Sequence, residues 1–172
     1  MKKIGIILLA LILLLSGCQA SSSETTGSVS STAATSEAAA GFVFKFDGVT
    51  IAMHAATASI LEKLGEPRQY FEAESCAFPG MEKTYAFASF SLYTYAFEGS
   101  DRVASVVLMD DSVSTPEGIY LNASLDDVVQ AYGNNYTKSL NLYSYESGKM
   151  KLSFIIENDV VTSIEYVALS GS

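Results

Sequence analysis

The sequence predicts an α+β fold of two tandem units, in which each unit packs a short helix on an antiparallel β-meander. Three observations lead to this prediction. Short runs of alternating apolar residues are separated by turn residues along most of the chain after residue 41. Two segments, at residues 57–64 and 124–132, change from strand-like alternation to a helical period. The order of these features then recurs after about 70 residues.

The first expected element is a β-hairpin that begins near Phe42. Phe42, Phe44 and Phe46 alternate with other residues, as side chains do on one face of a strand. Asp47-Gly48 is a hairpin turn signal, so residues 49–53 are expected to form the returning strand.

A helix and a meander are expected to follow this hairpin. Ile60, Leu61 and Leu64 fall on one helical face, and Gly65 ends the helix. Strand-like runs then alternate with turn residues at short intervals, which is typical of antiparallel strands. These runs cover residues 69–78, 83–87, 90–97 and 102–109.

The second half of the chain repeats this order. Glu117-Gly118 and the three residues after it mirror Asp47-Gly48. A second helix is expected over residues 124–132, with Ser124 as its N-cap and Gly133 at its end. Two diverged copies of one unit, residues 42–113 and 114–172, explain the recurrence economically. A chance likeness between two generic helix-plus-meander segments is the alternative.

A duplicated unit of this kind resembles the β-lactamase inhibitory proteins, small envelope-assembly lipoproteins and surface lipoproteins of Gram-positive bacteria. Besides the paired turn signals, the resemblance is carried by the helix ends Leu64-Gly65 and Tyr132-Gly133 and by the strands after Asp101 and Asp159. It covers residues 42–169 and implies a sheet with one face under the helices and the other open to a partner. No inhibitor residue of that family can be transferred to this chain.

The N-terminus has the features of a bacterial lipoprotein signal. Lys2 and Lys3 precede an apolar run, residues 4–15, that is short for a membrane span. Leu15-Ser16-Gly17-Cys18 resembles a lipobox, which implies removal of residues 1–17 and a diacylglyceryl lipid on Cys18 as the only attached group. An ordinary secretory signal or an uncleaved anchor are the alternatives. We therefore expect a lipid-anchored protein on the extracytoplasmic face of the cell membrane.

The segment behind the lipobox is expected to be a disordered tether. Residues 18–41 are mostly Ser, Thr, Ala, Gly and Glu, which bury too little apolar surface to order a backbone. Loss of Lys2 and Lys3 with the signal changes the formal net charge from −9 to −11. Such an acidic surface repels nucleic acid, so we expect no nucleic-acid partner.

Four tyrosines are the candidate binding residues. Tyr93 and Tyr95 share one face of their strand, and Tyr143 and Tyr145 share a face of what is interpreted as the corresponding strand of the second unit. Tyrosine offers a large contact area with a polar tip, so these rings could form a patch on an open sheet face. The alternative is that they complete the core or form cross-strand pairs.

Catalytic and metal sites receive little support from the sequence. His54 and Cys76 lack any local signature of a nucleophile and its base, and Glu72 with Glu74 is typical of a solvated edge strand. The acidic residues near 110–117 do not follow a calcium-loop spacing, and no metal or cofactor is expected. We expect a binding domain, not an enzyme, that engages a protein or peptide. A receptor for a small ligand or cell-wall fragment is the alternative.

Overall fold

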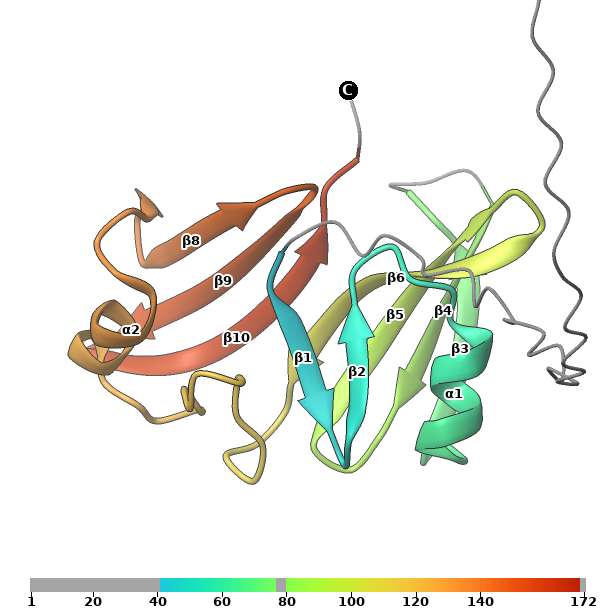
Figure 1. Cartoon of the computed structure of the whole chain (residues 1–172), viewed down its shortest axis with the longest axis horizontal. Coiled ribbons are helices and arrows are strands. Elements are labelled where there is room, and N and C mark those ends of the chain that lie inside the picture. The colour runs from blue at the N-terminus through green and yellow to red at the C-terminus, as the bar shows by residue number, and fades with distance from the viewer. Residues whose placement is uncertain (1–40, 77–79, 171–172) are drawn as a thin grey trace, which may run out of the picture. The chain divides into compact units, whose positions relative to one another are not determined.

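The computed structural model describes residues 41–76 and 80–170 (Figure 1). The predicted signal at residues 1–17, the predicted lipidation site Cys18 and the tether as far as residue 40 lie outside the described residues. Within the described ranges, neither helix is long and apolar enough to cross a membrane.

A two-stranded hairpin opens the described chain. Strand β1 (Val43–Phe46) pairs antiparallel with β2 (Val49–Ala52), which confirms the predicted hairpin. Asp47 and Gly48 form the turn between them with φ angles of 46° and 78°. Two successive positive φ angles match the twist of a two-residue hairpin, and this is why an Asp-Gly pair stands here.

The remaining strands form one antiparallel sheet. Its eight strands lie in the order β3-β4-β5-β6-β10-β9-β8-β7 (Figure 1). The strands are β3 (Gln69–Glu74), β4 (Met81–Ala86), β5 (Phe90–Phe97), β6 (Ser100–Leu108), β7 (Thr137–Ser139), β8 (Leu142–Ser147), β9 (Met150–Glu157) and β10 (Val160–Ala168). Two four-stranded meanders therefore meet through their last strands, β6 and β10.

The predicted α+β fold class is wrong, because the structure is mostly β. Strands account for 51% of it and helices for 12%. The two helices, α1 (Ala58–Leu64) and α2 (Leu125–Tyr132), lie where the sequence predicts them but are short, and each buries a single residue, Ile60 or Val128. Much of the layer over the sheet is supplied by the β1–β2 hairpin, which buries Phe44, Val49 and Ile51.

The pairing between β6 and β10 is short, because the chain after β2 bonds to the rest of β6 in place of β10. Strands β6 and β10 pair only over residues 105–107 of β6. Beyond this point His54 donates its backbone N–H to the carbonyl of Val103, and Val103 donates to Ala55, both at 3.0 Å. The segment after β2 thus lies beside the first half of β6.

The chain before α2 lies beside β10 in the same way. Asn122 donates its backbone N–H to Val161 at 2.9 Å, and Val161 donates to Ala123 at 2.8 Å. Asn122 has a φ of 78°, close to the 64° of His54 at the matching place. The local arrangement recurs, yet one sheet runs through both predicted units, so their division at residues 113 and 114 stays a prediction.

Among the described residues of the second half, no counterpart of the hairpin is present. Glu117-Gly118 and the residues up to Leu121 form turns and irregular chain, not the strand that the sequence comparison predicts. Thr115 explains the difference, because its N–H and Oγ1 bond the carbonyl and N–H of Ile119 and close a loop that buries Ile119.

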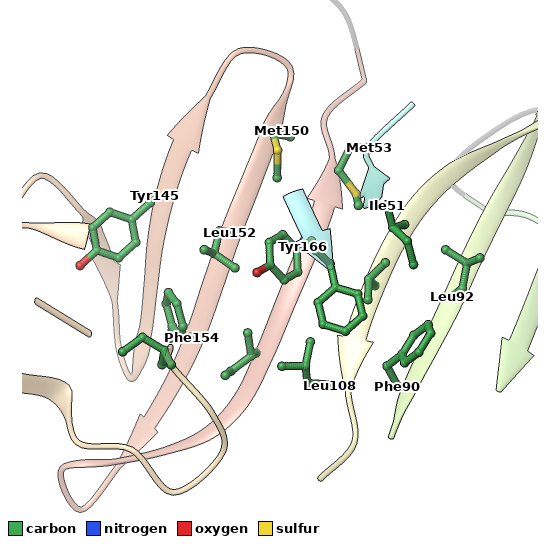
Figure 2. Packing of buried hydrophobic residues seen from close by; sticks show 14 of the residues in the cluster. Ile51, Met53, Phe90, Leu92, Leu108, Tyr145, Met150, Leu152, Phe154 and Tyr166 are labelled. Atoms are coloured by element: carbon green, nitrogen blue, oxygen red, sulfur yellow. The ribbon is translucent and has the colours of Figure 1, made fainter. Parts of the chain in front are cut away.

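The core lies between the hairpin and one face of the large sheet (Figure 2). Phe44 of β1 contacts Phe90 of β5, with ring centroids 5.1 Å apart, and Tyr166 of β10 at 6.0 Å. One hairpin residue therefore packs against both meanders. We call the sheet face that carries Phe90, Leu92 and Tyr166 the covered face, and the opposite one the open face.

Candidate binding site on the open face of the sheet

The open face carries a shallow hollow where the two meanders join. Cross-strand register places Tyr93 opposite Ser105, Ser105 opposite Val167, and Val107 opposite Glu165, so these side chains share a face. They alternate along their strands with buried residues of the covered face. The hollow has a volume of about 290 Å³, and we call it the junction hollow. It is lined by Glu82, Tyr93, Ala104, Ser105, Val107, Glu165, Val167 and Ala168.

A local irregularity in the sheet accompanies this hollow. The register between β5 and β6 shifts between Tyr93 and Thr94, so that Ala104 has no partner of its own on β5. Such a bulge bends the strand and changes the direction of the side chains beside it. Tyr93 and Ala104, which flank the shift, both line the hollow.

Glu165 is the chemically distinctive residue of the hollow. Burial raises the pKa of its carboxyl above the ordinary value, although Lys151 and a hydrogen bond from Ser105 both favour the charged form. A carboxylate that is partly removed from water and incompletely compensated gains from a cation placed beside it. With Glu82 at the same hollow, the site has two acidic groups among apolar walls. The arrangement suits a positively charged group carried on an apolar stem.

The structure places the four candidate tyrosines on opposite faces of the sheet. Tyr143 pairs with Phe154 and Tyr145 with Leu152, and those partners belong to the covered face. Tyr143 and Tyr145 are only 5% and 4% exposed, and Figure 2 shows Tyr145 among the core residues. Tyr93 and Tyr95 cannot form one patch with them. The sequence comparison matched β5 with β8, whereas the strand order makes β9 the counterpart of β5.

The hydroxyls of Tyr145 and Tyr95 have structural partners. Tyr145 donates to the carbonyl of Gly133, at the end of α2, over 2.9 Å. Tyr95 is 8% exposed, and its hydroxyl lies 2.9 Å from Nδ1 of His54. Tyr93 is the one of the four that is partly exposed, and it lines the junction hollow. Whether any of the four binds a partner stays a prediction.

His54 and Cys76 have separate surroundings. Nε2 of His54 lies 2.9 Å from the carbonyl oxygen of Lys149, so the ring joins β5 to the turn between β8 and β9. Cys76 is an exposed thiol after β3. In the described part of the chain no hydrogen bond joins the two side chains.

The carboxylates considered for other chemistry also lie apart. Glu72 and Glu74 are exposed on the edge strand β3, as predicted. Asp110 accepts hydrogen bonds from Ser112, which lower the pKa of its carboxyl. Within residues 41–76 and 80–170, no three acidic, histidine or cysteine side chains gather in a metal-binding group.

A second hollow, of about 370 Å³, lies beside α2. It is lined by Glu117, Gly118, Ile119, Tyr120, Ala123, Asp127, Gln130 and Ala131. Glu117 accepts a hydrogen bond from the hydroxyl of Tyr132. Burial, together with this hydrogen bond, raises the pKa of Tyr132 well above its ordinary value, so the phenol stays protonated. Glu117, which lines this hollow, is therefore already bonded to Tyr132.

Glu165 was not among the candidate residues that the sequence suggested. Its signal is nevertheless present, because Glu165 is the one charged residue in β10, flanked by Ile164 and Tyr166. A single carboxylate in an otherwise uncharged strand indicates either a solvent-exposed position or a functional site. The sheet order, which sequence reasoning did not supply, decides that it lies at the junction.

Comparison of the chain with protein-family models, curated proteins and solved structures finds no match. The resemblance to inhibitory and envelope-assembly proteins therefore stays an expectation based on fold-level features.

Proposed function

We propose that the protein is a lipid-anchored, extracytoplasmic binding domain whose open sheet face engages an extended peptide of a partner protein. The junction hollow takes a lysine or arginine side chain of that peptide. Cys18 carries the lipid, and the chemistry is binding, without turnover of the partner.

One observation carries this proposal. Glu165 lies half-buried beside Tyr93, Val107 and Val167, and Lys151 is its counter-charge among the described residues. An aliphatic stem can pack on these apolar side chains while its cationic head meets the carboxylate. The formal net charge of −9 also favours encounter with basic partners.

A matched pair of peptides tests the proposed recognition. The full chain in detergent solution is titrated against a fluorescein-labelled, strand-forming peptide with one central lysine, and against the same peptide with norleucine there. The lysine peptide should bind at least about tenfold more tightly, since a partly desolvated ion pair contributes more than an exposed one. Glu165→Gln should remove this preference, whereas Glu157→Gln, an exposed change on the same face but away from the hollow, should keep it. Equal binding of both peptides to the unmodified chain would contradict the proposal.

The lipid anchor is tested separately. Cells that produce the chain are fed a palmitate analogue, and labelling is compared between the unmodified protein and Cys18→Ser. Label should appear only on the former. Equal labelling of both proteins, or of neither, would remove the anchor from the proposal while leaving the peptide site intact.

The hollow beside α2 favours a second candidate function, a receptor for a small polar ligand or cell-wall fragment. Its lining by Glu117, Asp127 and Gln130 offers hydrogen-bond acceptors and an amide around about 370 Å³, which is within the range of small-molecule sites. Gln130→Ala should then weaken binding of a muropeptide probe without affecting the lysine peptide.

A further inference from the structure

The edge strand β3 leaves one side of its backbone available. Its six residues are all exposed, and the strand order gives it a neighbour, β4, on one side only among the described residues. It also exposes large apolar groups, because Tyr70 is 51% and Phe71 66% exposed. Long, exposed edges of this kind are ready to pair with another strand unless the protein blocks them.

Hydrogen-bond alternation determines which residues of β3 face outward. Ser75 donates to the carbonyl of Gly80, in the same register that pairs Phe71 with Thr84. In an antiparallel ladder, residues that bond the neighbouring strand alternate with residues that point away. Phe71 thus bonds toward β4, whereas Tyr70 and Glu72 present their N–H and C=O groups to the free side.

We propose that β3 pairs antiparallel with β3 of a second copy of this chain, about a two-fold axis that passes beside Phe71. The two outward-facing residues Tyr70 and Glu72 then stand opposite each other and can exchange both backbone hydrogen bonds. The pairing joins the two large sheets edge to edge. It does not involve the junction hollow and stands independently of the peptide-binding proposal.

The Phe71 pair and the charged residues beside it together select this register. With Phe71 opposite Phe71 of the other copy, Tyr70 faces Glu72. Arg68 directly precedes β3 and bonds its own N–H to the carbonyl of Ala86, so only its side chain is available to meet Glu74 of the other copy. Each contact occurs twice. Within each chain the hydroxyl of Tyr70 already donates to Glu72 at 2.6 Å, so the two groups are compatible neighbours. Arg68 and Glu74 are exposed, and neither forms a salt bridge in the described part of the chain.

Other pairings fit less well. A shift of two residues in one direction places Glu72 opposite Glu72 of the other copy, which is repulsive. A shift in the other direction removes the Phe71 contact, places Tyr70 opposite Tyr70, and moves Arg68 from Glu74 to Glu72. The opposite edge of the sheet, β7, has only three residues, so a β3–β7 pairing would be much shorter and would not close on itself.

Position-specific cross-linking tests the register. The full chain carries Cys76→Ser, to remove the exposed native thiol, together with either Phe71→Cys or Ala73→Cys. Opposed residues that do not exchange hydrogen bonds have Cα atoms about 4.5 Å apart, which suits a disulfide. Position 73 lies on the same face but would be about 13 Å from its counterpart. Mild oxidation should link the Phe71→Cys chains at least about fivefold more than the Ala73→Cys chains.

Charge reversal supplies the second test, read by the same Phe71→Cys cross-link. Arg68→Glu alone and Glu74→Arg alone each place like charges opposite one another and should reduce the dimer several-fold. The two changes together restore opposite charges and should restore the cross-link. Equal cross-linking at positions 71 and 73, or a double variant no better than the single ones, would overturn the proposal. Circular dichroism of each variant checks that the sheet is retained.

Discussion

Thr94 places its side-chain hydroxyl in the core. The residue is fully buried on β5, and its Oγ1 has no hydrogen-bond partner among the described residues. Thr94→Val keeps the shape and removes the unsatisfied oxygen, so the free energy of unfolding should rise by about 1–2 kcal/mol. Urea denaturation measures the change.

Thr115 is the matched control for Thr94. It is 2% exposed, and its Oγ1 accepts the N–H of Ile119 at 3.1 Å. Thr115→Val should therefore lower the free energy of unfolding by about 1–2 kcal/mol, because it leaves that N–H without its acceptor. A change of the same sign in both variants would show that the burial of the hydroxyl, and not its bonding, decides the outcome.

Glu165 should make stability depend on pH. Its pKa is raised above the ordinary 4.5, so the folded chain binds this proton more tightly than the unfolded chain does. Between 4.5 and the raised value, the free energy of unfolding contributed by this group falls as pH rises. Glu165→Gln should therefore be more stable than the unmodified chain at about pH 7.5, and the gain should vanish below about pH 4. Urea titrations at both pH values measure it, and a pH-independent gain would contradict the assignment.

Alternation along a strand was a sound guide at the residue scale, but it could not relate one strand to another. It predicted correctly that Tyr93 and Tyr95 share a face, as do Tyr143 and Tyr145. Which face each pair occupies depends on the order of the strands, and that order arises from long-range pairing. Because the strand order was unknown, the sequence also did not identify Glu165 as a site residue.

The two helix starts differ although both begin at a hydroxyl residue. Ser124 accepts the N–H of Asp127 at 3.1 Å, and Asp127 accepts the N–H of Ser124 at 3.0 Å, which is a capping box. Thr57 stands at the matching place of α1 but makes no side-chain cap. Ser124→Ala should lower the free energy of unfolding by about 1 kcal/mol, whereas Thr57→Val should not lower it.

The capping box also has a pH signature. Hydrogen bonds from Ser124 lower the pKa of Asp127 below its ordinary 3.8. The stabilisation is therefore complete above that pH and is lost as the pH falls through the lowered value. Thermal unfolding of Ser124→Ala beside the unmodified chain should show a difference at neutral pH that shrinks in acid. A difference of the same size in acid would indicate that Asp127 does not take part.

Local sequence signals predicted elements well where the backbone hydrogen bonds are made between residues close together in the sequence. The hairpin turn at Asp47-Gly48, both helix ends and the strands from β4 to β6 were predicted close to their bounds, whereas β3 ends at Glu74, short of the predicted residues 69–78. The comparison with Glu117-Gly118 failed because Ile119 bonds Thr115 instead of a partner strand. The short edge strand β7 has too few residues to show alternation.

The fold class itself depends on the whole molecule. Two helices were expected to cover the sheet, but helices of seven and eight residues bury little, and the β1–β2 hairpin covers the junction instead. Apolar alternation in residues 43–52 indicates a hairpin with one buried face. It does not indicate that this face spans two meanders, because that contact joins residues more than one hundred positions apart, such as Phe44 and Tyr166.

This shared core predicts that both meanders unfold together. Phe44 is fully buried and contacts Phe90 of one meander and Tyr166 of the other. Phe44→Ala should lower the free energy of unfolding by about 3–5 kcal/mol, and it should do so equally for both halves. Hydrogen exchange in increasing urea, read by mass spectrometry on peptides from β5 and from β9, measures the two halves separately.

The two possible results of this exchange experiment distinguish one cooperative domain from two. If residues 42–113 and 114–172 were independent units, Phe44→Ala would weaken the first and leave the protection of β9 unchanged. The pairing of β6 with β10 and the position of Phe44 argue instead for a single transition, since the hairpin and both meanders contribute to one core. Equal loss of protection in β5 and β9 would show that, although the local arrangement beside β6 and β10 recurs, the chain folds as one domain.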